Sequence, residues 1–293
     1  MISCIRIIAI MLVCFSANLL AEDKVVLISG GNGGLGQATV KAFYDKGWKV
    51  WAGYHKNIPV ECFGNGVNWV HLDVTNDYDV LAAVQKVLAT EGKIDALINN
   101  AGYGLISADD TLSMDAAKDI FEVNFFGALR LIQAVAPLMR VQESGHIINI
   151  SSTSGVRAVP GLGMYAASKF ALEGLSESLA VTLSPWNIKV SLIEPGTVNN
   201  EWIHHCVLNT EEEEPLYKKF CENLQAKLST LAATGQPCEE IAALIVQAAE
   251  SENPDMRIQT SQKVKDTVSK KFVELSGNAL LQEQITFLKS LTQ

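Results

Sequence analysis

Short runs of consecutive apolar residues recur along the first two thirds of the chain, and each is followed by a longer stretch whose apolar positions repeat every three or four residues. The short runs are typical of strands buried on both faces, and the longer stretches are typical of amphipathic helices. We therefore predict strands at residues 25–28, 48–52, 69–72, 94–98, 147–150 and 188–193. Between them we predict helices at about 35–46, 77–90, 116–140 and 166–183.

This strand–helix alternation predicts an α/β fold, a doubly wound parallel sheet of the Rossmann type in a single domain. Ligands of such sheets bind outside the carboxyl ends of the strands. Five polar or glycine sites fall at predicted strand ends, so we expect one crevice to collect them. They are the glycine turn at 29–36, Asp73, Asn100, Ser152 and Gly196.

The pattern becomes irregular after Gly196, and we expect residues of about 198–235 to form a lid whose apolar members suit an apolar ligand. The four glutamates at 211–214 precede Pro215 and predict a solvated helix start, where negative charge favours the helix dipole. A further helix through Ala249 and a last strand at 256–260 are predicted beyond the lid.

The first 23 residues differ from the rest, because Arg6 is followed by an apolar run at 7–15 and then by small and polar residues. The run is short for a membrane span and resembles a secretory signal, although Leu19 makes the cleavage site imperfect. Two other interpretations of these residues are an uncleaved membrane anchor and a wrongly assigned start codon, and the sequence leaves all three open.

Charge and cysteine content exclude two classes of partner. A formal net charge of −9 over 293 residues argues against nucleic acid, and the acidity is spread along the chain. The six cysteines lack metal or redox spacing, so thiols are expected. His204, His205 and Cys206 are interpreted as loop residues, and no metal site is predicted, because adjacent histidines cannot easily share one tetrahedral ion.

Candidate chemistry comes from two segments. The glycine-rich turn at 29–36 lies between a strand and a helix, where glycines let the backbone approach a pyrophosphate at the helix N-terminus; a flexible turn is the alternative.

Tyr165 and Lys169 are four residues apart on a predicted helix, and Ser152 ends the strand before it. An ammonium about 5 Å away, at an effective dielectric constant of about 20, lowers the pKa of a phenol by roughly two units. Such a trio suits proton transfer to an alcohol or carbonyl oxygen, although an isolated pair at this spacing also occurs by chance.

These motifs together make the chain resemble the short-chain dehydrogenase/reductase family, in its compact single-domain branch, over residues 24–196. Two further motifs agree in order, the run at 99–102 and the pair at 195–196. The resemblance implies that residues 24–293 form one catalytic domain in which Tyr165 is the acid/base. It also implies that Ser152 binds the substrate oxygen, Lys169 holds the nicotinamide ribose, and Asn124 bends its helix and holds a water in a proton relay.

The resemblance also implies a dinucleotide site. Its cofactor-binding residues would be Ser29, Gly30, Asn32, Gly34, Leu35, Gly36, His55, Asp73, Val74, Asn100, Ala101, Gly102, Tyr165, Lys169, Pro195, Gly196 and Val198. The second strand ends without the acid that would favour NAD, and His55 with Lys56 lies where a 2′-phosphate would bind, so NADP(H) is expected over NAD(H). Against this, Gly33 carries no charge. Ser29 and Asn200 stand where the family often has threonine.

The segments at 170–178 and 253–278 resemble hydroxysteroid and retinol dehydrogenases. The expected function is therefore NADP(H)-dependent oxidoreduction of a bulky apolar secondary alcohol or ketone, or of a retinol-type alcohol, such as a steroid or retinoid. The alternatives are a non-catalytic NADP-binding sensor or scaffold and a sugar-nucleotide epimerase, for which the 97 residues after Gly196 leave little chain. The family implies a homodimer or tetramer through the Tyr165 helix, whereas the leader favours a membrane-associated or exported protein and NADP(H) favours the cytosol or a reticulum lumen.

Overall fold

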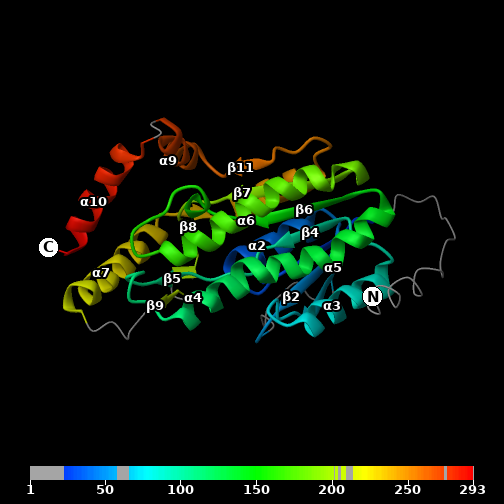
Figure 1. The fold of residues 1–293 in the computed structure, drawn as a ribbon. Helices are drawn as coiled ribbons and strands as arrows, with labels where there is room; N and C mark the ends of the chain where they lie inside the picture. The colour runs from blue at the N-terminus through cyan, green and yellow to red at the C-terminus, as the bar shows by residue number, and fades with distance from the viewer. Residues whose placement is uncertain are drawn as a thin grey trace.

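The computed structural model describes residues 23–57, 66–200, 202–203, 206–208, 214–273 and 276–292, and a parallel sheet of seven strands forms its centre (Figure 1). Every neighbouring pair of strands in this sheet is parallel. In spatial order the strands are β11 (Arg257–Gln259), β7 (Ile188–Glu194), β6 (Gly145–Ile150), β4 (Ala96–Asn99), β1 (Val25–Ile28), β2 (Lys49–Tyr54) and β3 (Val67–His71). The chain order reverses between β1 and β4, which is where such sheets open a crevice. The predicted fold class is confirmed.

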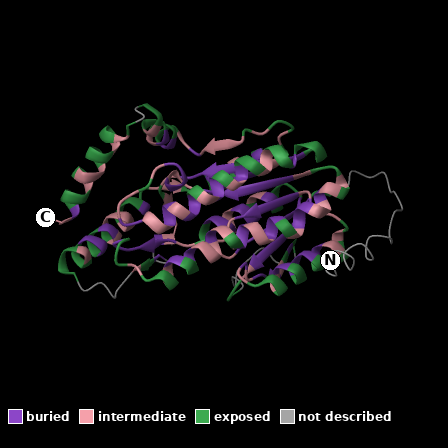
Figure 2. Cartoon of the chain, in the orientation of Figure 1, coloured by how far each residue is buried: buried purple, intermediate pink, exposed green. Residues whose placement is uncertain are grey.

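Helices cover both faces of the sheet and give three layers. On one face lie α2 (Gly34–Asp45) and α8 (Cys238–Glu250), and on the other lie α3 (Asp77–Glu91), α5 (Gly127–Gln142) and α6 (Gly163–Thr182). Strand β1 shows why: Val25 and Leu27 belong to the apolar cluster of one face, and Val26 and Ile28 to that of the other. Figure 2 shows the central strands of the sheet as largely buried, and every residue of β1 and β4 is buried. An apolar run without alternation is therefore what the position of β1 requires.

Two residues set the ends of α3, one at its start and one at its end. The side chain of Asn76 caps α3 by accepting from the backbone N–H of Tyr78 at 2.9 Å, and Gly92 closes the helix with φ of +77°. A left-handed residue at this position satisfies the last carbonyls, and glycine adopts it without steric penalty. The two signals confine α3 to the length needed to cross from β3 to β4.

The helix predicted at 116–140 is interrupted. It consists of α4 (Met114–Phe121), a π-helical turn at Glu122–Phe126 and α5, so one extra residue enters the helix at Asn124. By length and composition this run could cross a membrane, yet Leu131, Val135 and Met139 pack in the apolar core beneath the sheet. It is therefore a core helix with a π turn, a feature that often marks functional sites.

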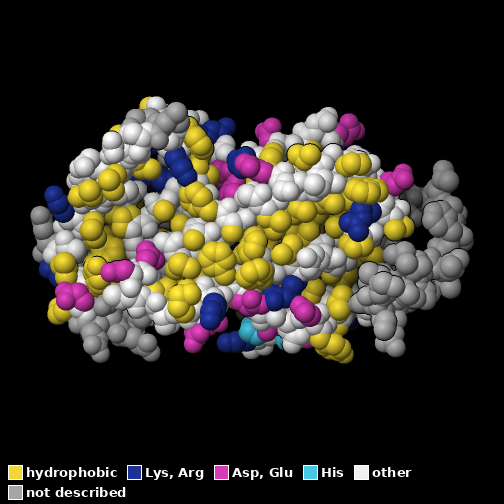
Figure 3. Space-filling model, viewed as in Figure 1, with side chains coloured by type: hydrophobic (Ala, Val, Ile, Leu, Met, Phe, Trp, Pro, Cys, Tyr) yellow, Lys and Arg dark blue, Asp and Glu magenta, His cyan; other side chains and the backbone are white. Residues whose placement is uncertain are grey.

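The outer face of α5 and α6 is apolar. Figure 3 shows hydrophobic side chains gathered in a band over these helices. Val141 on α5 is 67% exposed, and Val181 on α6 is 72% exposed. The predicted contact between copies of this chain through α6 and its neighbour would cover this band. It stays a prediction, because a single chain does not test it.

The last third of the chain adds a small apolar layer at one end of the sheet. Short strands pair there, β5 (Leu105–Ile106) with β9 (Val207–Leu208) and β8 (Val198–Asn199) with β10 (Gln236–Pro237). Helix α7 (Pro215–Ala232) begins at the predicted proline, and α9 (Gln262–Val273) and α10 (Asn278–Thr292) follow β11, with α10 lying along α7 (Figure 1). The predicted leader falls on residues 1–22, outside the described part of the chain, and on Asp23.

Candidate active site

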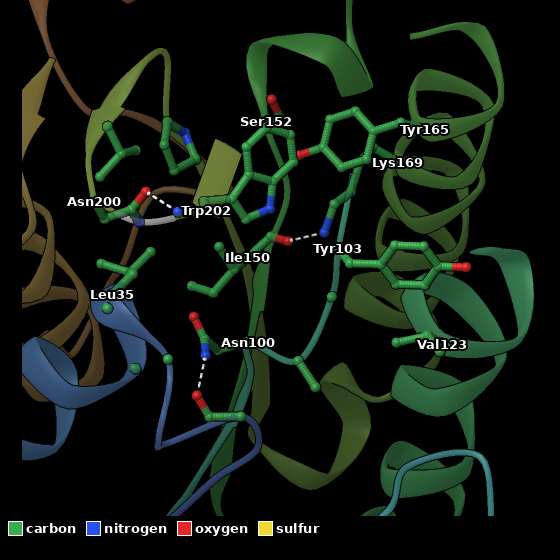
Figure 4. A pocket seen from close by; sticks show the side chains of 18 of the residues that line it. Leu35, Asn100, Tyr103, Val123, Ile150, Ser152, Tyr165, Lys169, Asn200 and Trp202 are labelled. Carbon is green, nitrogen blue, oxygen red and sulfur yellow. Dashed lines mark hydrogen bonds between the residues drawn. The ribbon is translucent and has the colours of Figure 1, made fainter. Parts of the chain in front are cut away.

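A cavity of about 650 Å³ opens at the carboxyl ends of the central strands, where we predicted one crevice. Its walls come from the turn after β1 and from the ends of β2, β3, β4, β6 and β7, together with α6. Figure 4 shows Ser152, Tyr165 and Lys169 together at one end of this cavity, with Leu35 and Asn100 toward the other. The cavity is therefore long enough to join the two predicted chemical segments.

The glycine turn is shaped by two close backbone approaches. Gly30 has φ of +62°, and a Cβ on Gly36 would lie 2.0 Å from the carbonyl oxygen of Gly30. No side chain can occupy Gly36 without opening the turn, because the start of α2 packs directly on it. Asn100 holds the same turn by donating from Nδ2 to the carbonyl oxygens of Ser29 and Gly30, both at 3.0 Å.

Ser29 supports this turn from beneath. Its hydroxyl accepts from the backbone N–H of Asn100 at 3.0 Å and of Ala101 at 3.1 Å, and its side chain is buried. It does not line the cavity, so its predicted part in cofactor binding is indirect. Ser29 ties the end of β1 to the end of β4 and thereby fixes the two turns between which a ligand would lie.

The other residues predicted to bind a cofactor do line the cavity. They are Gly30, Asn32, Gly34, Leu35, Gly36, His55, Asp73, Val74, Asn100, Ala101, Gly102, Tyr165, Lys169, Pro195, Gly196 and Val198. A narrow glycine cradle at a helix N-terminus and a buried ammonium at the far end suit a dinucleotide, whose phosphates need backbone N–H donors. The residues present therefore fit a nicotinamide dinucleotide.

Asp73 and His55 meet at the rim of the cavity. The carboxylate of Asp73 accepts from the backbone N–H of Thr75 at 2.9 Å and from its hydroxyl at 2.8 Å, and lies 3.4 Å from His55 Nε2. Although burial works to raise the pKa of Asp73, the hydrogen bonds from Thr75 and the charges of His55 and His71 lower it below its usual value. The rim therefore carries a fixed negative charge beside an imidazole.

Tyr165 is buried, and its pKa differs from the sequence-based prediction. Burial raises the pKa of Tyr165 to about 12, although a hydrogen bond with Ser152 favours the charged form. The prediction that Lys169 brings this pKa toward neutrality is wrong, because the pKa moves in the opposite direction. Loss of water around the phenol outweighs the ammonium, whose Nζ lies 5.9 Å from the centre of the phenol ring.

Lys169 is held away from the phenol by the strand below it. Its Nζ donates to the carbonyl oxygen of Ile150 at 2.8 Å, at the end of β6. Burial lowers the pKa of Lys169 to about 8, although the charge of Glu173 acts against this. Ser152 lies two residues beyond Ile150 and caps a short 3-10 turn by accepting from the backbone N–H of Ser154 at 3.0 Å.

Asn124 lies behind the cavity wall and does not line it. Its side chain contacts the backbone of Tyr103 and donates to the hydroxyl of Ser168 at 3.2 Å. A Cβ on Gly102 would lie 3.1 Å from Asn124 Oδ1 and 3.6 Å from Lys169 Nζ, so amide and ammonium approach the same small space. The helix has a π turn at Asn124, and both the predicted bend and the predicted water relay stay predictions.

Helix α6 is positioned from its N-terminus. Oδ1 of Asp109, from the loop after β5, accepts from the backbone N–H of Met164 at 3.2 Å, and a Cβ on Gly163 would collide with this carboxylate. A carboxylate at a helix N-terminus satisfies free N–H groups and favours the dipole. Asp109 therefore fixes the turn that carries Tyr165.

Sequence reasoning missed most of the apolar wall of the cavity. This wall comprises Tyr103, Val123, Val159, Leu162, Trp202, Ile203, Leu228 and Ala232. The ring of Trp202 lies 5.2 Å from that of Tyr165, and its backbone N–H donates to Asn200 Oδ1 at 3.0 Å. The apolar residues after Gly196 had indicated part of this wall, whereas the amphipathic spacing of α7 fits ordinary packing equally well.

Metal chemistry has no support in the described ranges. No group of three or more histidine, cysteine, aspartate or glutamate side chains converges there. The predicted loop residues His204 and His205 lie outside those ranges. Buried Cys206 lies close to Gly104 and Tyr165, and burial raises the pKa of its thiol to about 12.

Comparison with known proteins adds family information to this geometry. The family model described as short chain dehydrogenase matches residues 24–209. Human retinol dehydrogenase 8 is 34% identical over 276 residues, covering 88% of each chain. A 3-ketodihydrosphingosine reductase from Bacteroides thetaiotaomicron is 34% identical over 238 residues, covering 80% of this chain and 87% of its own. Human 17-beta-hydroxysteroid dehydrogenase type 1 is 32% identical over 222 residues, covering 74% and 67% respectively.

Proposed function

The chain belongs to the short-chain dehydrogenase/reductase family, and from this premise we propose that it is an NADP(H)-dependent oxidoreductase. It would interconvert a bulky apolar secondary alcohol and its ketone, or a retinol-type alcohol and its aldehyde. The bound nicotinamide supplies or accepts the hydride. Tyr165 gives or takes the proton at the substrate oxygen, Ser152 donates a hydrogen bond to that oxygen, and Lys169 orients the cofactor ribose.

One observation carries the proposal. Tyr165, Ser152 and Lys169 line the same cavity as the glycine turn. The nicotinamide of a cofactor bound at the turn would therefore lie close to the phenol and to a substrate bound there. The raised pKa of Tyr165 keeps the phenol protonated, which suits donation to a carbonyl oxygen during reduction. The positive charge of Lys169 acts to lower the pKa of Tyr165, which favours removal of the alcohol proton by Tyr165 during oxidation. A sensor or scaffold function would need neither residue, and no observation favours it.

The preference for NADP(H) rests on the end of β2. His55 lines the cavity next to the glycine turn, and β2 ends without a carboxylate that would bind two ribose hydroxyls. The imidazole of His55 lies 3.4 Å from the Asp73 carboxylate, which holds it at the rim of the cavity. A 2′-phosphate at this point would meet the imidazole of His55, with Lys56 next in the chain.

The apolar wall supports a bulky apolar substrate. Trp202, Ile203, Leu162 and Leu228 surround the end of the cavity at which Tyr165 lies. Such a wall contributes binding energy in proportion to the apolar area that a ligand buries. The relatives named for retinol, a steroid and a ketosphingoid substrate agree with this class.

The test is oxidation of NADPH and NADH by the purified full-length protein with all-trans-retinal, a 17-ketosteroid, a long-chain 3-keto sphingoid base and acetone. We expect turnover with NADPH on at least one bulky substrate and little turnover on acetone. Turnover with NADH alone would contradict the cofactor assignment. Cofactor binding without turnover on any carbonyl or the corresponding alcohols would contradict the proposed reaction.

A further inference from the structure

A group of buried polar side chains lies near Lys169. It comprises Ser151 at the end of β6, Glu173 on α6 and Glu194 at the end of β7, all of which are buried. Burying a carboxylate costs free energy unless it is paired, so carboxylates buried next to a reaction centre indicate a functional requirement.

Two buried carboxylates in this group share one cation. Arg257 Nε lies 3.0 Å from Glu173 Oε2 and 3.5 Å from Glu194 Oε1. The same guanidinium also bonds Glu177 through Nη2, so its charge is divided among three carboxylates. The Glu194 carboxylate also accepts a hydrogen bond from Gln259 Nε2 at 2.9 Å. When the two buried carboxylates are ionised, their negative charge therefore exceeds the single positive charge of Arg257.

Glu173 lies one helical turn beyond Lys169 on α6, so both side chains rise from the same face. Lys169 Nζ donates to the carbonyl oxygen of Ile150, and Ser151 follows in the chain. A Cβ on Gly155 would lie 2.5 Å from Ser151 Oγ and 3.2 Å from Glu173 Oε1, so these oxygens border one small space. The carboxylate, the hydroxyl and the strand end that holds Lys169 are thus adjacent.

We propose that Glu173 is a positioning residue for the reaction, the buried counter-charge that keeps Lys169 a cation. Lys169 is 5% exposed, and an ammonium with so little water needs a nearby anion to stay charged. The excess negative charge described above supplies this anion. Glu194 on β7 adds to it and Arg257 on β11 subtracts from it, whereas water screens the charge of Glu177, whose side chain is 58% exposed.

Lys271, another cation near this group, does not replace Lys169. Lys271 on α9 donates to the carbonyl oxygen of Val156 and lies 4.1 Å above the ring of Phe170. Burial raises the pKa of Glu173 to about 7 and lowers that of Lys169 to about 8. Glu173 is therefore mostly charged above about pH 7, and its protonation at lower pH removes the counter-charge.

The effect of Glu173 on catalysis rests on the proposed function, whereas its effect on stability does not. The first experiment needs neither cofactor nor turnover. Its failure is therefore distinguishable from failure of the proposed function. Melting temperatures are measured for wild type, Lys169→Met, Glu173→Gln and the double variant at pH 5.5 and pH 8. At pH 8 we expect Lys169→Met to lower the melting temperature by about 3 °C more in the wild-type background than in Glu173→Gln. At pH 5.5, where Glu173 is protonated, this difference should vanish. Additive effects at both pH values would overturn the proposal.

The second experiment follows the alkaline limb of kcat/KM against pH, where loss of the Lys169 proton ends activity. Glu173→Gln should move this limb about one unit toward lower pH, which is about a tenfold loss on the limb. Glu177→Gln is the matched control, because Glu177 bonds the same guanidinium from the same helix but its side chain is 58% exposed. An equal shift in both variants, or none in Glu173→Gln, would overturn the proposal.

Discussion

The side chain of Asn124 pairs with both backbone groups of Tyr103. Its Oδ1 accepts from the N–H of Tyr103 and its Nδ2 donates to the carbonyl oxygen, each at 3.0 Å. A regular α-helix through 116–140 would not contain the extra residue that the π turn inserts at this position. The π turn thus ties the helix between β4 and β6 to the loop that forms one wall of the cavity.

Replacing Asn124 with alanine should destabilise the protein. The change leaves the N–H and carbonyl oxygen of Tyr103 without their partner, and buried groups left unpaired cost about 1–3 kcal/mol each. We expect the free energy of unfolding, from urea titration, to fall by about 3 kcal/mol. Gln133→Ala on the exposed face of α5 is the control and should change it by less than about 0.5 kcal/mol. Equal effects of the two substitutions would refute this role of Asn124.

Tyr165→Phe should abolish turnover while preserving cofactor binding. The ring keeps its packing against Trp202, and only the proton donor is lost. We expect kcat to fall by about 10³-fold, with the NADPH dissociation constant from fluorescence quenching changed by less than about twofold. Tyr103→Phe removes another phenol that lines the cavity and should retain turnover. Normal turnover in Tyr165→Phe would disprove the assigned acid/base.

The sequence predicted the fold and most of the cavity because both depend on local signals. Apolar runs such as 25–28 mark buried strands, and residues at strand ends must share one edge of a parallel sheet. The pKa of Tyr165 could not be read in this way, because it depends on how much water the folded chain excludes. Leu228 and Ala232 were missed for a related reason: the spacing of α7 predicts an apolar face but not which partner that face meets.

His146 predicts a loss of stability in acid. Burial, followed by the charge of Lys189, lowers its pKa from 6.5 to about 4, and Nε2 lies 3.0 Å from Ser191 Oγ. Between pH 6.5 and 4 the unfolded chain binds a proton that the folded chain does not, so the free energy of unfolding falls as pH falls. When the histidine of the unfolded chain is fully protonated, the free energy of unfolding is lower by about 3 kcal/mol than at neutral pH.

The measurement is urea unfolding of wild type and His146→Asn at pH 7.5, 6 and 5. The variant loses the titrating group, so its stability should decline less over this range than that of wild type. His71→Asn, which replaces a histidine whose side chain is 51% exposed, is the control and should follow wild type. Parallel decline in His146→Asn and wild type would show that other groups cause the acid sensitivity.

Trp202→Ala should reduce activity selectively on bulky substrates. The indole covers Tyr165 and forms part of the apolar wall, and losing a large apolar contact costs about 1.5–3 kcal/mol. We expect kcat/KM to fall at least about tenfold on the best bulky carbonyl of the panel and to change little on a small ketone. Trp186→Ala, on the turn before β7, is the matched control. Equal losses on large and small substrates would assign Trp202 to folding rather than to substrate binding.

His55→Asp should shift the cofactor preference toward NADH. The new carboxylate would lie at the end of β2, where it repels a 2′-phosphate and can accept hydrogen bonds from two ribose hydroxyls. It would also face Asp73, now 3.4 Å from the imidazole, so some loss of stability is expected with the change of preference. We expect the ratio of kcat/KM for NADPH to that for NADH to fall by about 10–100-fold, which one charge–charge contact near the surface can supply. His55→Asn removes the imidazole without adding a charge and should lower the ratio less. If the ratio is the same in wild type and both variants, residue 55 does not contact the 2′-position, and the assignment of NADP(H) loses its structural basis.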